Sequence, residues 1–340
     1  MSIFDTSPPL INKDILFKWI YKNYDFLDSN IINSIKLNSE RDYNLKITTN
    51  NNKNFVIKIS NPYENINTLT LQDSMLEYLS NSSVSKYIPI ISHKDIKKFT
   101  DLKNRECFVR ILSFLKGDIF AHHQGNDQLC KNLSIFLGNL SKSLLNFDHS
   151  AAHRKFIWNS INIEWIEEDL EIFPEKIKRN LIKKVIKSYL KYVKPKLSNI
   201  RYSVIHGDAN NYNILCSKNK IVGLLDYGDS IYAPTICELT VALAYALMNT
   251  DDIIQKCNYM VKSYHSIFQL NKDEIELIMI LIMTRLSITV TMASKQKLKY
   301  PDNEYLSISE NDAWDLLFKF DNIIYSDFTN NLLNVCNYEK

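Results

Sequence analysis

The sequence is poor in glycine, which excludes two common ways of holding phosphate groups. Only six of the 340 residues are glycine, and none precedes Gly117. The chain contains neither G-x-G-x-x-G nor a Walker A sequence, in which glycines let the backbone approach phosphate oxygens closely. A phosphate-binding loop in the first part of the chain would have to use other residues.

An excess of charge and a spaced set of cysteines are also missing. The 41 basic residues nearly balance the 38 acidic ones, giving a net charge of +3, which argues against a nucleic-acid partner. The six cysteines are scattered without a C-x-x-C pair, so there is little support for a zinc site. This spacing predicts reduced, mostly buried thiols, as in a cytoplasmic protein.

No apolar run predicts a membrane span. Leu239–Met248 is too short, and Leu277–Met292 carries Arg285 together with several Ser and Thr residues. We expect both runs to be buried core helices. The N-terminal segment MSIFDTSPPLINKD has no basic start followed by an apolar run, so no signal peptide is predicted. We therefore expect a cytoplasmic protein with no membrane partner.

The most informative stretch is SVIHGDANNYNILCSKNKIVGLLDYGD, residues 203–229. A first short apolar strand leads into H-G-D, ending at Asp208, and Asn213 follows five residues later. A second apolar strand leads into D-Y-G-D, beginning at Asp226, which is 18 residues after Asp208. A hairpin-like excursion through Cys216–Lys220 predicts that the two strand ends lie side by side.

This arrangement suits phosphoryl transfer, which needs a carboxylate to orient the attacking hydroxyl and a metal to neutralise the phosphate oxygens. Asp208 fits the first role. Asn213 and Asp226 fit the second, since hard oxygen ligands suit Mg²⁺. Asp, Asn and Gly also gather in turns that carry no chemistry, but the two strand contexts and the fixed gap favour a site.

The pattern H-x-D-x-x-x-x-N followed by D-Y-G resembles the catalytic and metal-binding loops of protein kinases. In the form H-G-D with D-Y-G-D it is more similar to the aminoglycoside phosphotransferase and choline kinase family. VIHGDANNYNIL and GLLDYGD are most similar to its hydroxylysine kinase-like branch. The resemblance implies an α+β, protein kinase-like fold of two lobes. Residues 1–115 would form a small antiparallel-sheet lobe that binds nucleotide, and residues 116–340 a larger, mostly helical lobe for catalysis and substrate binding.

The resemblance also implies nucleotide-binding residues in the small lobe. Alternation along the strand Phe55–Ile59 places Lys58 on the face opposite Ile57 and Ile59, where family members hold the nucleotide phosphates with a lysine. A lysine on a strand edge is the simpler alternative. The family's helix glutamate, which pairs with that lysine, corresponds here to Gln72.

Two further segments are expected to contact the nucleotide. Ser39 and Asn44, at the ends of the turn SERDYN, would donate to phosphate in place of a glycine-rich loop, although a plain hairpin turn is equally compatible with the residues. Ser113 and Leu115 correspond to the family's hinge. Hinge contacts to the base use backbone groups, so these residues leave ATP and GTP undecided.

Carboxylates are expected on the acceptor side. The run EWIEEDLE, residues 164–171, lies where the family builds its substrate pocket, and Glu167, Glu168 and Asp169 would hold a cationic amine. Asp229 would add a further negative group. Acidic runs are more often solvated faces, and Asp229 can also serve simply to cap its turn.

Together these features predict a Mg²⁺-dependent small-molecule kinase. It would transfer the γ-phosphate of ATP or GTP to a hydroxyl of an amino alcohol such as hydroxylysine. One alternative is an aminoglycoside antibiotic phosphotransferase with the same chemistry. The other is a non-catalytic nucleotide-binding protein. Gln72 and the missing glycines favour this alternative, whereas the presence of Asp208, Asn213 and Asp226 argues against it.

Overall fold

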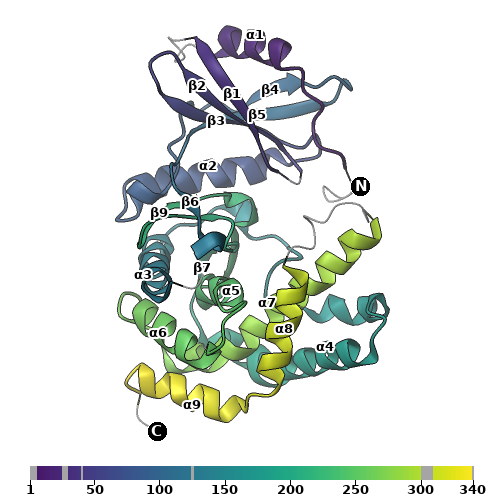
Figure 1. The fold of residues 1–340 in the computed structure, drawn as a ribbon, viewed down its shortest axis with the longest axis vertical. Coiled ribbons are helices and arrows are strands. Elements are labelled where there is room, and N and C mark those ends of the chain that lie inside the picture. The colour runs from purple at the N-terminus through teal and green to yellow at the C-terminus, as the bar shows by residue number, and fades with distance from the viewer. Residues whose placement is uncertain (1–5, 25–29, 40, 124–125, 300–308, 339–340) are drawn as a thin grey trace. The chain divides into compact units, whose positions relative to one another are not determined.

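The computed structural model describes residues 6–24, 30–39, 41–123, 126–299 and 309–338. The chain divides after Lys116 into two compact units. The first unit is a mixed sheet-and-helix lobe and the second is mostly helical (Figure 1). This is the α+β class with a small antiparallel-sheet lobe that the motif resemblance implies.

The small lobe is built on a five-stranded antiparallel sheet with the order β1-β2-β3-β5-β4. Its elements are α1 (Lys13–Asn23), β1 (Ile31–Leu37), β2 (Tyr43–Thr49), β3 (Asn54–Ile59), α2 (Ile66–Ser80), β4 (Lys97–Thr100) and β5 (Glu106–Ser113). The short strand β4 was not expected from the sequence. Helix α1 begins where the Asn12 side chain accepts hydrogen bonds from the Asp14 and Ile15 amides, as an N-cap does.

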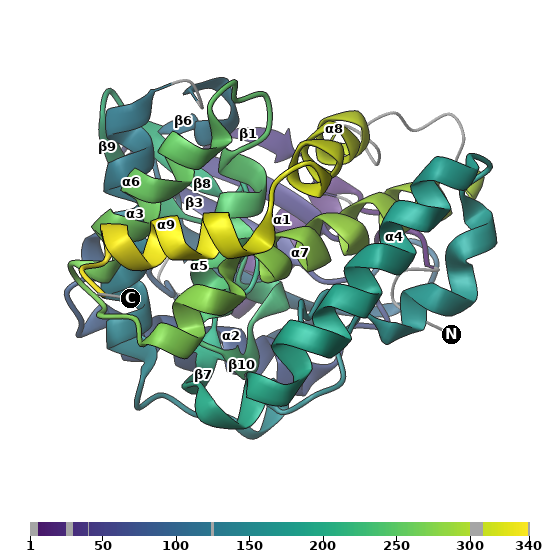
Figure 2. The ribbon, with the colours of Figure 1, turned by 90° about the horizontal axis from the view of Figure 1, so that it is seen from below.

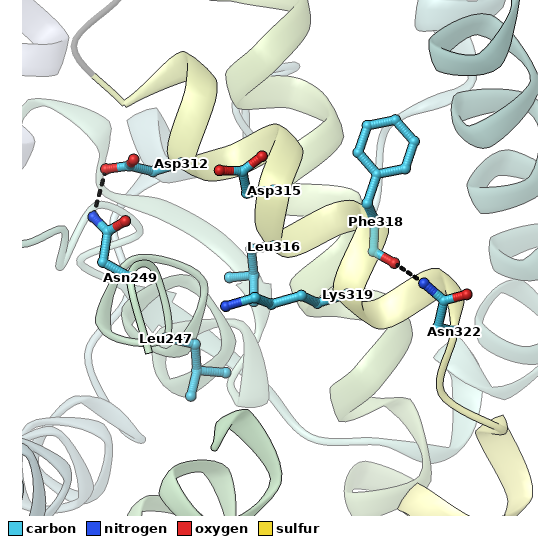
Figure 3. Close-up of a pocket in the computed structure, with 8 residues that line it drawn as sticks. All are labelled: Leu247, Asn249, Asp312, Asp315, Leu316, Phe318, Lys319 and Asn322. Carbon is cyan, nitrogen blue, oxygen red and sulfur yellow. Dashed lines mark hydrogen bonds between the residues drawn. The ribbon is translucent and has the colours of Figure 1, made fainter. Parts of the chain in front are cut away.

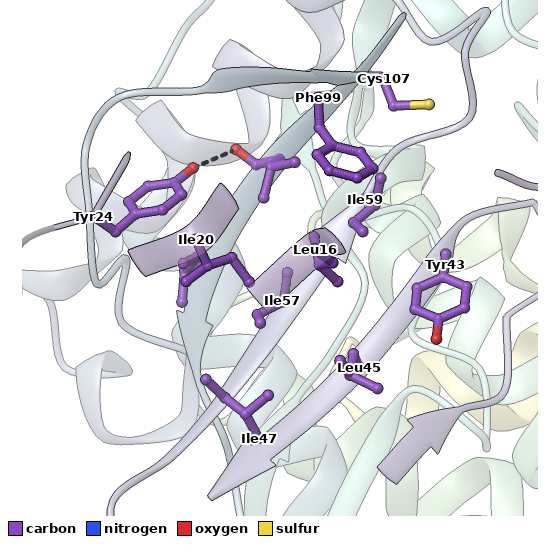
Figure 4. Packing of buried hydrophobic residues seen from close by; sticks show 12 residues of the cluster. Leu16, Ile20, Tyr24, Tyr43, Leu45, Ile47, Ile57, Ile59, Phe99 and Cys107 are labelled. Atoms are coloured by element: carbon purple, nitrogen blue, oxygen red, sulfur yellow. Dashed lines mark hydrogen bonds between the residues drawn. The ribbon is translucent and has the colours of Figure 1, made fainter. Parts of the chain in front are cut away.

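Side chains alternate between the two faces of this sheet, as the strand period requires. Ile57 and Ile59 point into a core that includes Leu16 and Ile20 of α1 (Figure 4). The buried Tyr24 at the end of α1 donates its hydroxyl hydrogen to a backbone carbonyl of β5 at 3.2 Å. The intervening residue, Lys58, is therefore on the other face, as the alternation predicts.

The large lobe carries two small sheets among its helices. Strand β7 (Tyr202–Ile205) pairs with β10 (Ile231–Pro234), while β8 (Ile214–Ser217) pairs with both β9 (Lys220–Leu224) and the short β6 (Asp118–Ile119). The expected hairpin through Cys216–Lys220 exists, but it joins β8 to β9. The sequence interpretation missed β8 and β10 and expected β7 and β9 to be joined directly.

Helix α7 (Lys272–Lys299) is the core of the large lobe. It contacts α4 (Lys176–Ser188), α5 (Ile236–Ala246), α8 (Glu310–Asp321) and α9 (Tyr325–Val335) (Figure 2). The lobe also contains α3 (Asp127–Leu144), α6 (Ile253–His265) and a 3₁₀ helix over Glu164–Ile172, where the sequence predicted a helical acidic run. Among the described residues, α7 alone is long and apolar enough to cross a membrane, but 94% of its apolar window is buried. It is a core helix, as predicted.

Candidate active site

The loop after β7 has its shape fixed by Gly207. This residue has φ +75°, and a Cβ atom there would lie 3.0 Å from the Asp229 carbonyl oxygen, so glycine is required on both conformational and steric grounds. The buried Glu238 of α5 accepts a hydrogen bond from the His206 amide at 2.6 Å. The sequence predicts a structural role for Glu238, as an anchor of the loop after Asp229; in the structure it anchors the loop before Asp208.

The Asp208 carboxylate accepts hydrogen bonds at both oxygens. Arg285 Nη2 donates to Oδ1 at 2.6 Å, while the side-chain amides of Asn210 and Asn213 donate to Oδ2 at 2.9 and 2.7 Å. The Asp208 side chain is 18% exposed. Its carboxylate is thus fixed by three donors and still reaches solvent, as a group that must meet a substrate hydroxyl requires.

Burial is the main influence on the charge of Asp208, and it raises the pKa of this carboxyl. The guanidinium of Arg285 opposes that rise, whereas the nearby carboxylates Asp229 and Asp226 add to it. Carboxylates with raised pKa values are typical of acid–base sites, because burial and like charge favour the protonated form.

His206 acts as a structural brace. Its ring is completely buried, its Nε2 lies 2.9 Å from the Leu225 carbonyl, and its Nδ1 accepts the Asp208 amide at 3.3 Å. This pattern requires the neutral tautomer with hydrogen on Nε2, and burial lowers the pKa of His206 to about 4. The ring thereby joins the ends of β7 and β9, which brings the H-G-D and D-Y-G-D motifs together.

Asn213 and Asp226 lie at the same end of the β8–β9 hairpin, since the Leu225 amide donates to the Asn213 carbonyl at 2.8 Å. The side-chain nitrogen of Asn213 donates to Asp208, so the Asn213 Oδ1 takes no part in this contact. Asp226 is exposed and has φ 57°, a left-handed backbone conformation that is uncommon for residues other than glycine. These two oxygen donors fit Mg²⁺. The described residues contain no group of three or more His, Cys, Asp or Glu side chains arranged to hold a metal ion by themselves.

The loop that carries Asp229 is fixed by Arg154, which donates to the Gly228 and Ser230 carbonyls at 2.7 and 3.2 Å. Asp229 lines a small cavity together with Gly207 and Trp158. The structure therefore places Asp229 next to the H-G-D loop.

The acidic run on the 3₁₀ helix is divided in its surroundings. Glu167 and Glu168 are exposed, while Asp169 Oδ2 lies 2.5 Å from Lys295 Nζ of α7. The charge of Asp169 is thus already compensated within the lobe, whereas Glu167 and Glu168 are open to a ligand.

In the small lobe, three polar residues form a row across the sheet. Asn44 of β2 lies opposite Lys58 of β3, which lies opposite Arg110 of β5. Directly opposed residues share a face, so all three lie on the face opposite the α1 core. The buried Asn44 Oδ1 has no hydrogen-bond partner among the described residues.

Helix α2 supplies the partners for this row. Gln72 Oε1 accepts from Arg110 Nη1 at 2.7 Å, and Asp73 Oδ1 lies 3.0 Å from Arg110 Nε. Burial raises the pKa of Asp73, against the positive charges of Arg110 and Lys58. Asp73, next to the Gln72 that the sequence selects, is therefore a carboxylate influenced by the charge of Lys58.

The remaining nucleotide candidates are also defined. The Ser39 hydroxyl accepts the Asp42 amide at 3.1 Å and keeps its own hydrogen to donate; Glu40 of the same turn lies outside the described residues. Ser113 exchanges backbone and side-chain hydrogen bonds with Ile90 at 2.8 Å. For Leu115, no backbone partner is present in the described part of the chain, which leaves its amide and carbonyl available.

The sequence profile of the phosphotransferase enzyme family matches residues 35–256. The chain belongs to this family. As a member it is a kinase that acts on a hydroxyl group, and membership implies a nucleotide co-substrate. The matched region includes Lys58 and all of the H-G-D and D-Y-G-D residues.

Among curated proteins, this phosphotransferase is 29% identical to mouse hydroxylysine kinase over 220 residues, covering 61% of this chain and 58% of the mouse protein. It is 25% identical to the bovine hydroxylysine kinase over 299 residues, covering 79% and 77%. A solved aminopropanol kinase associated with a microcompartment matches with a TM-score of 0.70 at 11% identity, over 95% of this chain and all of that one. This last likeness shows the protein kinase-like fold alone.

One pocket of the phosphotransferase, in the described part of the large lobe, contains none of the predicted site residues. It has a volume of about 290 Å³ and lies beside α8 (Figure 3). Most of its polar side chains are bonded to neighbouring groups: Asn249 to Asp312 at 2.8 Å, Asn322 to the Phe318 carbonyl at 2.9 Å, and Lys319 to the Thr250 carbonyl at 2.8 Å. Satisfied groups of this kind offer little to a ligand, and the candidate site residues lie elsewhere.

Sequence reasoning missed Arg285 and Asp73. Arg285 is far from the motifs along the chain and was noted only because it interrupts an apolar run. A charge inside an otherwise apolar helix was the available signal, because a buried guanidinium must find a carboxylate. For Asp73, the available signal was that it is an acid directly next to Gln72, the position at which the family has glutamate.

Proposed function

We propose that this phosphotransferase is a Mg²⁺-dependent kinase that transfers the γ-phosphate of ATP or GTP to a hydroxyl of a small amino alcohol, with hydroxylysine as the leading candidate. The observation that carries the proposal is the Asp208 carboxylate, fixed by three donors and still partly exposed. The names of the curated relatives support the acceptor.

In this proposal Asp208 accepts a hydrogen bond from the acceptor hydroxyl and takes its proton late in the transfer. Its two asparagine partners and Arg285 keep the carboxylate oriented while the hydroxyl binds. His206 remains neutral and holds the two motif loops together. Orientation of this kind is most of what a protein must contribute to phosphoryl transfer.

Asn213 and Asp226 would hold Mg²⁺, which neutralises charge on the phosphate oxygens when bound. Lys58 would contact the phosphates, with Gln72 and the neighbouring Asp73 on α2 supporting it. Ser39 and Asn44 would donate to phosphate, and the backbone of Ser113 and Leu115 would meet the base.

The acceptor amine would be held by carboxylates. Asp229 is the strongest candidate because it lines the same cavity as Gly207. Glu167 and Glu168 are exposed and supply further negative charge, whereas Asp169 would contribute less because Lys295 already compensates it. The near-balanced charge and the six buried, free cysteines are consistent with work on a small molecule in the cytoplasm.

A coupled nucleotide-consumption screen tests this function. Purified protein is offered ATP or GTP with Mg²⁺ and one acceptor at a time: 5-hydroxylysine, ethanolamine, aminopropanol, choline, kanamycin and glycerol. We expect phosphorylated product, identified by mass spectrometry, with amino alcohols first. A preference for glycerol would refute the amine assignment, and a preference for kanamycin would move the protein to antibiotic modification. Nucleotide binding without product from any acceptor would refute the enzyme.

A further inference from the structure

Arg285 is a fully buried charge in the middle of the apolar helix α7. Its side chain is only 1% exposed, and its neighbours Thr284 and Leu286 are both completely buried. A guanidinium costs much free energy to bury unless it is paired and hydrogen bonded. Its presence in the core therefore calls for a specific role.

The contacts of Arg285 converge on the catalytic loop. Nη2 donates to Asp208 Oδ1 at 2.6 Å, and Nη1 reaches the carbonyls of Trp158 and Gly207 at 3.2 and 3.4 Å. The guanidinium carbon lies 4.8 Å from the Trp158 ring centroid and 5.6 Å from that of Tyr245. Both terminal nitrogens of the guanidinium thus donate hydrogen bonds, and two aromatic rings flank the group.

We propose that Arg285 is a positioning residue for phosphoryl transfer: it fixes the orientation of the Asp208 carboxylate and ties the Trp158 segment to the catalytic loop. This inference rests on the proposed function, in which Asp208 orients the acceptor hydroxyl. Trp158 and Gly207 also line the small cavity that contains Asp229. Arg285 therefore fixes both the base and one wall of the adjacent cavity.

Arginine suits this position better than lysine. Four acceptors surround the group, namely one carboxylate oxygen, two backbone carbonyls and the Tyr245 hydroxyl oxygen at 3.4 Å from Nη2. The planar guanidinium presents donors in a fixed fork and stacks on aromatic rings, whereas a lysine ammonium is a single point charge on a flexible stem. Lysine would keep the charge and lose the simultaneous contacts.

The decisive experiment is a double-mutant cycle on turnover, with Arg285→Met, Asp208→Asn and the pair. A displaced catalytic group costs about 10²-fold in rate, so we expect Arg285→Met to lower kcat by roughly that factor and to change the nucleotide KM little. In the Asp208→Asn background, Arg285→Met should have almost no further effect, because residues that act as one unit are not additive. Independent, multiplicative losses would overturn the proposal.

Two further variants separate positioning from general stability. Arg201→Met breaks another ion pair in the large lobe, in which Nη2 lies 2.5 Å from the buried Glu274; it should lower the melting temperature with little change in kcat. Arg285→Lys keeps the buried charge and serves if Arg285→Met does not fold. We expect Arg285→Lys to fold and to lose turnover, and full turnover would refute the positioning role.

Chemical rescue gives an independent readout. Millimolar guanidinium added to Arg285→Ala should restore part of kcat, whereas ammonium at the same concentration should not. Equal effects of the two cations would contradict the role of the fork. A wild-type protein that phosphorylates no acceptor would overturn this proposal and the proposed function together. An active wild type whose kcat survives Arg285→Lys and Arg285→Met would overturn the role of Arg285 alone.

Discussion

Replacing Asp208 with asparagine is expected to stop turnover while leaving nucleotide binding nearly intact. The carboxylate meets donors at both oxygens: Arg285 on one side, and Asn210 and Asn213 on the other. An asparagine at this position would place its NH₂ group against a donor in either orientation: against Arg285 in one, and against Asn210 and Asn213 in the other. We expect its oxygen to stay with the buried Arg285, because an NH₂ group against a buried cation costs more.

The magnitudes follow from that orientation. Loss of a positioned base lowers kcat by about 10²–10⁴-fold, and loss of the charge-assisted bonds destabilises the fold by about 1.5–3 kcal/mol. Asn213 keeps its 2.9 Å hydrogen bond to the Asp208 backbone carbonyl, so the proposed metal ligand retains an anchor. The Kd of the Mg²⁺–nucleotide complex should therefore change by no more than about threefold, less than 1 kcal/mol.

Steady-state kinetics and calorimetric nucleotide titrations measure the two effects separately. Asp118→Asn, which neutralises an exposed acid on β6 of the same lobe, is the matched control and should leave both quantities unchanged. A loss of nucleotide affinity as large as the loss of kcat would mean that Asp208 contacts the metal or the phosphates. The assignment of Asp208 as the group that orients the acceptor would then be wrong.

Three further predictions test other parts of the molecule. Asp226→Ala should abolish the Mg²⁺-dependent part of the nucleotide-induced rise in melting temperature, whereas Glu238→Ala, which removes the acceptor of the His206 amide, should lower the melting temperature and keep that rise. A full Mg²⁺-dependent rise in Asp226→Ala would exclude Asp226 as the main ligand. The double variant Glu167→Gln with Glu168→Gln should raise KM for a cationic acceptor up to about fivefold, as expected for exposed charges, with a smaller change in kcat. Glu171→Gln, which neutralises a neighbouring exposed acid, is the control. An equal effect of Glu171→Gln would indicate only a non-specific effect of negative charge in this region. In the small lobe, burial tends to raise the pKa of Asp101. Hydrogen bonds from the Arg105 side chain and from three backbone amides outweigh this effect and lower the pKa to about 2. A lowered pKa stabilises the fold at pH values above the ordinary carboxyl pKa, and this stabilisation is lost as the pH falls toward 2. The free energy of unfolding in urea at pH 7 should therefore be about 2 kcal/mol higher for wild type than for Asp101→Asn. A difference that persists near pH 2 would contradict this account.

The features predicted correctly are those that the chain encodes locally. The face of Lys58 follows from strand alternation over five residues, and Ile57 and Ile59 indeed pack in the core. The meeting of the H-G-D and D-Y-G-D loops follows from the short excursion between them. The strand β8 was missed because its four residues carry too little pattern to distinguish a strand from a loop.

The features missed depend on contacts between distant residues. Gln72 and Asp73 are adjacent in sequence, and only the packing of α2 against Arg110 of β5 decides what each one contacts. Helical spacing can select a turn of a helix, but it does not fix which of two neighbouring side chains meets a cation on a facing strand. The contacts that Gln72 and Asp73 each make with Arg110 therefore could not be assigned from spacing alone.

Arg285 shows how one such contact can be inferred before a structure exists. Helix α7 is otherwise uncharged through its centre, so a charge there must be paired or the helix would not be buried as it is. Its partner must be an acid that is itself placed in the interior by the fold. Asp208 meets that condition, because it follows a buried strand and a loop whose glycine admits no side chain. A lone arginine in a core helix and a motif carboxylate at the end of a buried strand are therefore each evidence for the other.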